Sequence, residues 1–393
     1  MKTIIEETMK CVRCGNCKAF CPTYLEGLSE AVSARGRVIL IKNLIESRLK
    51  PSARLSDDIY SCLLCEACKV QCPLSIDVTS IIYEGRRLLV ASDQKRRGLR
   101  WLLRLMSRYP QFAFRLSRLC QDTLYPYLYR KGIIPFRLNI PRAPLKDEHQ
   151  VLRPDTKKGR VAIFVGCSTN YIFPHLGLSL INVLLRMGYE VILPKGEVCC
   201  GAPFRELGLH KDAVRMAKRN LSIFGKLNVE AILTLCPTCL LSIRYQYEDL
   251  IGEVIDNAQD VSKFLLDRLG DIELKEPDLE TVSYHDPCHH INSMGIMKEP
   301  RELLNRAGLR IIEMDESGCC GFAGLFSLGY RELSRVLLQK RVASFRKTGA
   351  EALVTSCPGC ILQLSREIDD TPIYHIIEVI EMILNNPNLP AEN

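Results

Sequence analysis

Short apolar runs alternate with longer amphipathic stretches over the second half of the chain. The first three runs, at residues 161–165, 189–193 and 231–235, are rich in Val, Ile and Leu. The stretches between them are long enough to form helices. Short apolar strands separated by helices are typical of a parallel sheet covered on both faces. The pattern therefore predicts an α/β fold from about residue 159 onwards.

The same region is a tandem repeat. Its cysteine landmarks recur 120 or 121 residues later, as Cys167 and Cys288, Cys199 and Cys319, Cys236 and Cys357, and Cys239 and Cys360. We therefore expect one repeat over residues 159–275 and a second over residues 276–393. Each cysteine group follows an apolar run directly, at the strand edge where ligands gather in open α/β sheets. The pattern predicts one ligand site in each repeat.

Helical spacing dominates the first part of the chain. Apolar residues recur at about every third or fourth position through Gly36–Glu46, which predicts a mainly helical domain over residues 1–85. A chain of 393 residues is long enough for two or three domains. The predicted fold class is a multidomain α+β protein: a mainly helical N-terminal domain, then two tandem α/β repeats with parallel sheets.

Residues 86–158 form a basic connector between these regions. Residues 86–118 hold ten Lys and Arg and one acid, Asp93, and so account for the formal net charge of +8. Four arginines at steps of three and four predict a cationic helix face before Pro110: Arg97, Arg100, Arg104 and Arg108. The apolar residues of the same stretch lie largely off that face: Leu99, Trp101, Leu102, Leu103, Leu105 and Met106. Such a helix can lie on an anionic membrane with its arginines at the headgroups. The alternative is a helix docked on protein with solvated arginines. We expect no nucleic-acid partner, because no recognition motif accompanies the charge.

The expected location is cytoplasmic. The opening MKTIIEETMK has no apolar signal core, and the uncharged stretch 161–185 is interrupted by Gly166 and Pro174, so it predicts no transmembrane helix. C-x2-C pairs without an export signal indicate thiolate–metal ligation in a reducing compartment. If the basic helix binds lipid, the protein is peripheral on the inner face of the cell membrane.

Eight cysteines near the N-terminus form two runs of identical spacing, each followed by proline. The spacing C-x2-C-x2-C-x3-C is that of two cubane [4Fe–4S] clusters, in which the fourth cysteine of each run serves the other cluster. One predicted ligand set is Cys11, Cys14, Cys17 and Cys72, and the other is Cys62, Cys65, Cys68 and Cys21. Two structural zinc sites are the alternative, although zinc usually takes paired C-x2-C knuckles.

Each repeat offers five further thiols as candidate metal ligands. They are Cys167, Cys199, Cys200, Cys236 and Cys239 in the first repeat, and Cys288, Cys319, Cys320, Cys357 and Cys360 in the second. Adjacent cysteines cannot both face inward on a strand, so each pair is expected in a loop, where the glycine that follows permits an unusual backbone. Pro237 and Pro358 are expected at the first position of a helix. Each site holds an iron–sulfur centre, a zinc ion on four thiols, or no metal.

Three histidines and one cysteine lie outside the predicted ligand sets. His285, His289 and His290 surround Cys288 and can supply a metal ligand or a proton. Their alternative role is ordinary hydrogen bonding inside a loop. Cys120 is most simply a packed thiol.

The order of these motifs resembles that of the cysteine-rich CCG-domain iron–sulfur proteins over nearly the whole chain. This family includes heterodisulfide reductase, the iron–sulfur subunit of glycolate oxidase and the third subunit of anaerobic glycerol-3-phosphate dehydrogenase. The stretch from Cys11 to Tyr24, followed by Arg35-Gly36-Arg37, is most similar to the glycolate oxidase subunit. Both repeats keep all five cysteines, whereas the first repeat of that family is often degenerate. Complete repeats resemble heterodisulfide reductase, where such motifs bind non-cubane [4Fe–4S] clusters.

The resemblance implies an iron–sulfur electron-transfer subunit of a flavin-dependent 2-hydroxyacid dehydrogenase acting on glycolate or D-lactate. Its partner would be an FAD-containing subunit, and its acceptor a quinone or another oxidant. The chain has no G-x-G-x-x-G after a strand and no P-loop, so we expect no flavin of its own. The second hypothesis is a heterodisulfide-reductase-type subunit that reduces a disulfide at a repeat-bound cluster. The third is an electron-delivering scaffold with zinc in both repeats.

Overall fold

The N-terminal region packs as a bundle of short helices. The computed structural model describes residues 4–136, 139–146, 149–268, 279–315 and 318–384. The regular elements of the first unit are α1 (Ile4–Met9), η1 (Asn16–Lys18), α2 (Pro22–Gly27), η2 (Glu30–Val32), α3 (Ala34–Ile45), α4 (Ala53–Tyr60), α5 (Ala67–Val70) and α6 (Val78–Leu89). The side chains of Ile41, Ile59, Ile81 and Ile82 are fully buried where α3, α4 and α6 meet. The predicted helical domain is confirmed, and its long helix α3 covers the expected stretch.

The rest of the chain forms two sheets of matching topology. The first repeat contains β2 (Gly159–Ile163), α10 (Gly166–Tyr171), α11 (Pro174–Arg186), β3 (Tyr189–Leu193), α12 (Ala202–Glu206), α13 (His210–Phe224), β4 (Ala231–Thr234), α14 (Pro237–Leu241), η3 (Ser242–Gln246), α15 (Tyr247–Ile251), β5 (Ala258–Asp260) and α16 (Val261–Leu266). The second contains β6 (Thr281–His285), η4 (His290–Met294), α17 (Lys298–Arg306), β7 (Arg310–Ile311), α18 (Phe326–Gly329), α19 (Arg331–Thr348), β8 (Ala352–Thr355), α20 (Pro358–Leu364), β9 (Ile373–His375) and α21 (Ile376–Ile383). The predicted α/β repeats are therefore confirmed.

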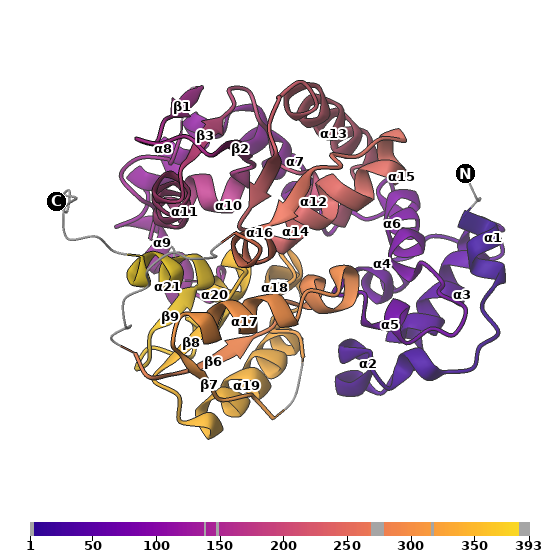
Figure 1. Cartoon of the computed structure of the whole chain (residues 1–393). Coiled ribbons are helices and arrows are strands. Elements are labelled where there is room, and N and C mark those ends of the chain that lie inside the picture. Colours follow the sequence, from indigo (N-terminus) through magenta and orange to yellow (C-terminus); the bar gives the residue numbers. More distant parts are fainter. Residues whose placement is uncertain (1–3, 137–138, 147–148, 269–278, 316–317, 385–393) are drawn as a thin grey trace.

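Strand order shows the duplication directly. The first sheet has the order β1-β3-β2-β4-β5 and the second β7-β6-β8-β9, so the parallel parts have the same order in both copies. The antiparallel edge strand β1 (Gln150–Leu152) comes from the connector. The two repeats pack through α11 and α16 of the first against α17 and α21 of the second, over one shared apolar core. Figure 1 shows the sheets on the left and the N-terminal unit beside both of them.

The connector corrects one prediction from the sequence. It forms α7 (Arg97–Arg108), α8 (Pro110–Leu119) and α9 (Leu124–Arg130), with Pro110 separating the first two as expected. Arg100 does not face solvent or lipid, because it is buried and its Nη2 donates to Oδ2 of Asp93 at 2.6 Å. Nε of Arg104 donates to Oδ2 of Asp212 at 2.9 Å. Two arginines of the cationic stripe thus dock α7 on the chain itself, whereas Arg97 and Arg108 are exposed.

The outer side of the connector is apolar. Its large exposed side chains are Trp101, Leu102, Leu105, Met106, Tyr109, Phe112, Leu116, Leu119, Leu124, Tyr127 and Ile133, which we call the connector face. Among the residues that the structure describes, none of the helices is both long and apolar enough to cross a membrane.

Candidate metal centres

The two N-terminal cysteine loops share an unusual backbone. In each, the residues before and after the second cysteine have positive φ: Arg13 (61°) and Gly15 (91°) in the first loop, Leu64 (57°) and Glu66 (61°) in the second. Non-glycine residues seldom adopt this conformation and do so where the surroundings impose it. Because two residues of each loop have positive φ, the backbone turns sharply twice and wraps around an enclosed space.

Each loop lines a cavity together with the remote cysteine of the other run. One cavity is lined by Cys62, Cys65 and Cys68 with Cys21, and the other by Cys11, Cys14 and Cys17 with Cys72. Four thiols around one cavity fit the donor set of a cubane cluster. The structure thus brings together the cysteines that the crossed pattern predicts, and their ligation of clusters stays a prediction. We call these spaces the inner cavity (Cys62 loop) and the outer cavity (Cys11 loop).

The two cavities are neighbours. Cys68 and Val78 line both of them. Burial raises the pKa of the Cys68 thiol well above its usual value, and the charges of Cys62 and Cys65 raise it further. A bound metal cation would lower the pKa of this thiol again, because cysteine binds metal as the thiolate.

A buried arginine lies beside the inner cavity. Arg37, in α3, is 1% exposed and lines this cavity. Its Nη2 donates to Oγ of Ser61 at 2.6 Å, its Nη1 donates to Oγ1 of Thr23 at 3.1 Å, and its Nε donates to the carbonyl oxygen of Asp58 at 2.8 Å. All are neutral acceptors. The sequence analysis noted Arg37 only as part of a motif and missed its place as a buried positive charge beside the inner cavity.

The five thiols of each repeat are gathered into one site. Interactions link neighbouring thiols in the order Cys167, Cys199, Cys200, Cys239 and Cys236 in the first repeat, and Cys288, Cys319, Cys320, Cys360 and Cys357 in the second. Hydrogen bonding from Cys199 and then Cys239 lowers the pKa of Cys200 well below its usual value. Hydrogen bonding from Cys288 and then Cys320 does the same for Cys319. Hydrogen bonding among the same thiols raises the pKa of Cys199 and Cys288 well above the usual value, so each site pairs a thiol that ionises readily with one that keeps its proton.

Local structure fixes these thiols as the sequence predicted. Gly201 and Gly321 follow the cysteine pairs with φ of 92° and 80°, the left-handed conformation that glycine allows. Pro237 and Pro358 begin α14 and α20. Nδ2 of Asn220 holds the first paired loop by donating to the carbonyl oxygen of Cys199 at 3.2 Å. In the second repeat, Nε2 of Gln363 donates to the carbonyl oxygen of Cys320 at 3.1 Å.

The second repeat lies directly against the inner cavity loop. Leu63 and Cys65 pack in one apolar cluster with Cys319, and Cys288 borders it. Burial, followed by the charge of Cys319, raises the pKa of Cys65 well above its usual value. Nδ2 of Asn292 donates to the carbonyl oxygen of Cys65 at 2.8 Å. This junction between distant parts of the chain was not visible in the sequence.

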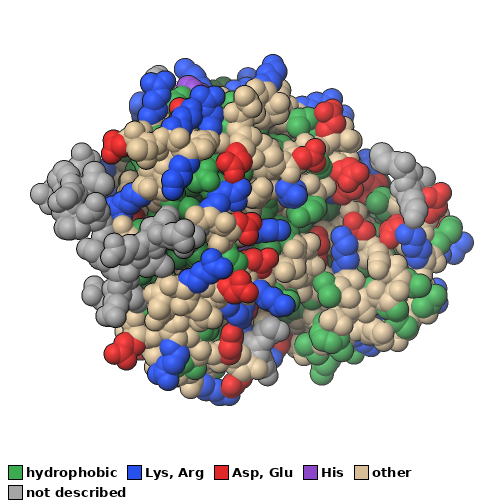
Figure 2. Space-filling view, viewed as in Figure 1, with side chains coloured by type: hydrophobic (Ala, Val, Ile, Leu, Met, Phe, Trp, Pro, Cys, Tyr) green, Lys and Arg blue, Asp and Glu red, His purple; other side chains and the backbone are tan. Residues whose placement is uncertain are grey.

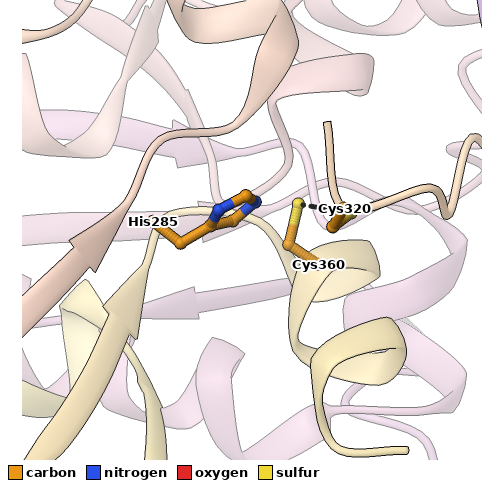
Figure 3. Close-up of side chains that lie close together, drawn as sticks. All are labelled: His285, Cys320 and Cys360. Carbon is orange, nitrogen blue, oxygen red and sulfur yellow. Dashed lines mark hydrogen bonds between the residues drawn. The ribbon is translucent and has the colours of Figure 1, made fainter. Parts of the chain in front are cut away.

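The histidines around Cys288 have different surroundings. His289 hydrogen-bonds to Leu64 and Thr238, and Nε2 of His290 lies 3.0 Å from Oδ2 of Asp260, so both serve as ordinary polar partners. His285 points its ring at the thiols of Cys320 and Cys360 (Figure 3). Burial and then the nearby Arg341 guanidinium lower the pKa of His285 to about 4. Cys120 is half-buried and caps the C-terminus of α8, and its role as a packed thiol stays a prediction.

Comparison with known proteins agrees with this arrangement. A model of the 4Fe-4S dicluster domain matches residues 7–76, and a model of the cysteine-rich domain matches residues 161–244 and 282–365. The chain contains two CCG cysteine-rich domains and one 4Fe-4S dicluster domain. The dicluster match covers both cavity loops, and the two cysteine-rich matches cover the two thiol sites. This CCG-domain protein therefore carries iron–sulfur clusters and takes part in electron transfer.

Relatives of known name span most of this CCG-domain protein. It is 28% identical to the probable glycolate oxidase iron-sulfur subunit of Bacillus subtilis, over 92% of this chain and 89% of that one. It is 26% identical to a subunit of the dihydromethanophenazine:CoB–CoM heterodisulfide reductase of Methanosarcina barkeri, over 94% of this chain and 92% of that one. A crystal structure of a hypothetical protein from Helicobacter pylori shares the fold, with a TM-score of 0.53 at 14% identity over 90% of this chain and 68% of that one.

Proposed function

We propose that this chain is the electron-transfer subunit of a flavin-dependent 2-hydroxyacid dehydrogenase that oxidises glycolate or D-lactate. An FAD-containing partner would oxidise the substrate, and this chain would carry the electrons to a quinone or another acceptor. One observation carries the proposal: the outer cavity, the inner cavity and the thiol site of the second repeat are consecutive neighbours, with Cys68 lining both cavities and Cys65 packed on Cys319. Adjacent redox centres are what a relay requires.

The outer cavity is the proposed docking end for the partner. Cys14 is exposed there, so a centre held by this loop would lie near the surface. Val12 and Leu74 line this cavity and are exposed, and further large apolar side chains are exposed elsewhere on the N-terminal unit at Met9, Phe20, Leu25 and Leu28. Figure 2 shows apolar side chains gathered over this unit, at the lower right. Exposed apolar patches of this kind are typical of protein interaction sites.

Each group of residues has its own role along the proposed electron path. Cys11, Cys14, Cys17 and Cys72 would hold the outer cubane, and Cys62, Cys65, Cys68 and Cys21 the inner one. The ten thiols of the repeats would hold the further centres, as non-cubane iron–sulfur clusters or zinc. When bound, the cubanes supply one-electron redox chemistry. The protein itself sets their spacing, excludes water through the apolar junction and positions the charge of Arg37.

The connector face is the proposed membrane contact. Its large aromatic and aliphatic side chains are exposed, and the exposed charges nearby are mostly cationic, at Arg97, Arg108, Arg115 and Arg130, with one acid at Asp122. Amphipathic helices that lie in an anionic membrane surface have this composition. Binding there would place a cytoplasmic protein on the inner face of the membrane, within reach of a quinone.

The test is substrate-dependent reduction of the complex. Tagged protein purified anaerobically from its own cells should bring down a flavin-containing partner. Adding glycolate or D-lactate should then bleach the iron–sulfur absorbance, and Cys62→Ser should reduce that bleaching while leaving flavin reduction intact. A complex without flavin, or one in which neither acid reduces the clusters, would contradict this function.

The heterodisulfide-reductase-type function is the second candidate. It is favoured by the complete thiol set of both repeats and by Cys167, which is exposed at the first site and could meet a disulfide substrate. Turnover of a heterodisulfide by the isolated chain with a reduced dye, lost in Cys167→Ser, would support it. Absence of turnover in a chain with full iron content would exclude it.

A further inference from the structure

The two thiol sites differ at one buried position. Three residues before the first cysteine of each set, the first repeat has Phe164 and the second has His285. Phe164 packs in an apolar cluster with Cys239, and its ring lies 5.3 Å from that of Phe224. The same place in the second repeat carries an imidazole. The repeats therefore offer different donor sets, although their cysteines match.

His285 is aimed at two of the thiols of its site. It lies at the end of β6, and its ring points toward Cys320 and Cys360 (Figure 3). The ligand atoms of these three residues all lie within 4.8 Å of one another, and the two sulfurs are 3.4 Å apart. Two sulfurs on one tetrahedral metal are about 3.8 Å apart for bonds of about 2.3 Å. The two sulfurs would need to move apart by only a few tenths of an ångström to share one metal ion, with the imidazole nitrogen close by.

In the described part of the chain, one ring nitrogen of His285 has no hydrogen-bond partner that would compete with metal binding. His285 is 2% exposed, and its Nε2 has no hydrogen-bond partner among the described residues. An unsatisfied buried polar group is costly, so a native structure rarely keeps one without a ligand or partner. Neutral imidazole and thiolate are the ligands that zinc and iron share. Phe164 leaves no such donor in the first repeat.

We propose that His285 is a nitrogen ligand of the metal centre in the second repeat, together with Cys320, Cys360 and further thiolates of the same set. The first repeat then holds an all-thiolate centre. The inference rests on the proposed presence of metal in the repeats. Because replacing thiolate by imidazole raises the potential of an iron–sulfur centre, the second site would have the higher potential if it holds iron. It would attract electrons from the inner cubane, against which it packs.

Isotope labelling of the whole chain tests this ligand directly. Anaerobically purified protein is prepared with ¹⁴N- or ¹⁵N-histidine, and hyperfine spectroscopy records nitrogen coupling to the paramagnetic centres. X-ray absorption at the zinc edge reports a nitrogen ligand if the site holds zinc. We expect a histidine nitrogen signal that changes with the isotope. This measurement needs no variant, so it does not depend on whether a variant folds.

Two substitutions locate the signal. His285→Phe copies the first repeat and should abolish the nitrogen signal while leaving the two cubane signals, and His285→Cys should restore metal content without nitrogen. His149→Gln, at an exposed position, is the matched control and should change nothing. Persistence of the signal in His285→Phe, or a metal centre without nitrogen in the wild type, overturns the proposal. Iron for the cubanes alone, with no zinc bound, overturns it too, and reduction of those cubanes by glycolate or D-lactate would show that the proposed function survives.

Discussion

His289 joins Leu64 across the junction between the N-terminal unit and the repeats. Its Nε2 lies 3.1 Å from the carbonyl oxygen of Leu64, 225 residues away in the chain. Its Nδ1 lies 3.0 Å from Oγ1 of Thr238, between the C-x2-C cysteines of the first repeat. A neutral imidazole has one N–H and one acceptor nitrogen, so Nε2 donates to Leu64 and Nδ1 accepts from Thr238. One ring thus holds three cysteine-bearing loops in register.

Replacing this ring should loosen the junction. His289→Phe removes both hydrogen bonds and leaves the Leu64 carbonyl without its donor, so we expect a loss of about 1–3 kcal/mol in unfolding free energy. Weaker docking should also reduce the magnetic interaction between the inner cubane and a paramagnetic centre in the second repeat. Denaturant unfolding and EPR of the reduced protein measure the two effects. Unchanged values in both, compared with a His149→Gln control, would show that apolar packing alone sets the junction.

Crossed ligation, in which the fourth cysteine of each run binds the cluster of the other run, can be tested by substituting each fourth cysteine separately. If ligation is crossed, Cys72→Ser damages the outer cubane and Cys21→Ser the inner one, because those residues line the outer and inner cavities. The inner cubane is the one that should interact magnetically with the second repeat, so only Cys21→Ser should remove that interaction. Iron content and EPR of each variant provide the measurement. The opposite assignment would show that each run binds its own cluster.

Arg37 should raise the potential of the inner cubane. It is a buried cation that lines the inner cavity and donates to the carbonyl oxygen of Asp58 and the hydroxyls of Thr23 and Ser61, so its charge would stabilise the more negative, reduced cluster. Arg37→Met should lower the midpoint potential by on the order of 60 mV, the equivalent of a tenfold change in the one-electron equilibrium. Arg37→Lys, which keeps the charge, should restore most of it. Redox titration followed by EPR checks both, and equal potentials for Met and wild type would contradict the role.

Local pattern was enough to predict three parallel strands in each repeat, the helices between them and the cysteine loops, but not the edge strands β1, β5 and β9. The adjacent cysteines required loops, and Gly201 and Gly321 have the backbone that such loops need. The junction of Cys65 with Cys319 could not be predicted, because it depends on how separately folded parts dock. Arg100 shows the same limit. Periodicity predicted the two faces of its helix but not which one is buried, although Asp93, the single acid in that basic stretch, was the available signal.

The connector face can be followed through one fluorophore. Trp101 is the single tryptophan of the chain and is 64% exposed. If this face binds lipid, vesicles of phosphatidylglycerol should shift its emission to the blue, whereas phosphatidylcholine vesicles should do so weakly and salt should reduce the effect.

Charged substitutions on the same face provide the control for this experiment. Phe112→Glu with Leu119→Glu places two anions among its most exposed side chains and should abolish vesicle binding. Leu178→Glu, at an exposed position of α11 outside the connector, should leave it intact. Equal emission with and without anionic vesicles would assign the face to a protein partner.

His375 should make the second repeat acid-sensitive. It caps α21: its Nδ1 accepts from the backbone N–H of Ile377 at 3.2 Å, and its Nε2–H donates to the carbonyl oxygen of Leu235 at 3.1 Å. Burial lowers its pKa to about 4. The unfolded chain, with a histidine pKa of about 6.5, therefore binds the proton first, so stability is full above that pH and falls as the pH drops towards 4.

The size of this effect follows from the two pKa values. Between about pH 7.5 and about pH 5, His375 should cost about 2 kcal/mol of unfolding free energy. His375→Asn keeps a capping acceptor but cannot titrate, much as Asp260 caps α16 at the corresponding place in the first repeat. Denaturant unfolding at the two pH values should give a smaller loss for the variant than for the wild type. Acid lability of the clusters affects the wild type and the variant alike. Equal losses of unfolding free energy in the two would therefore show that the acid sensitivity does not come from this cap.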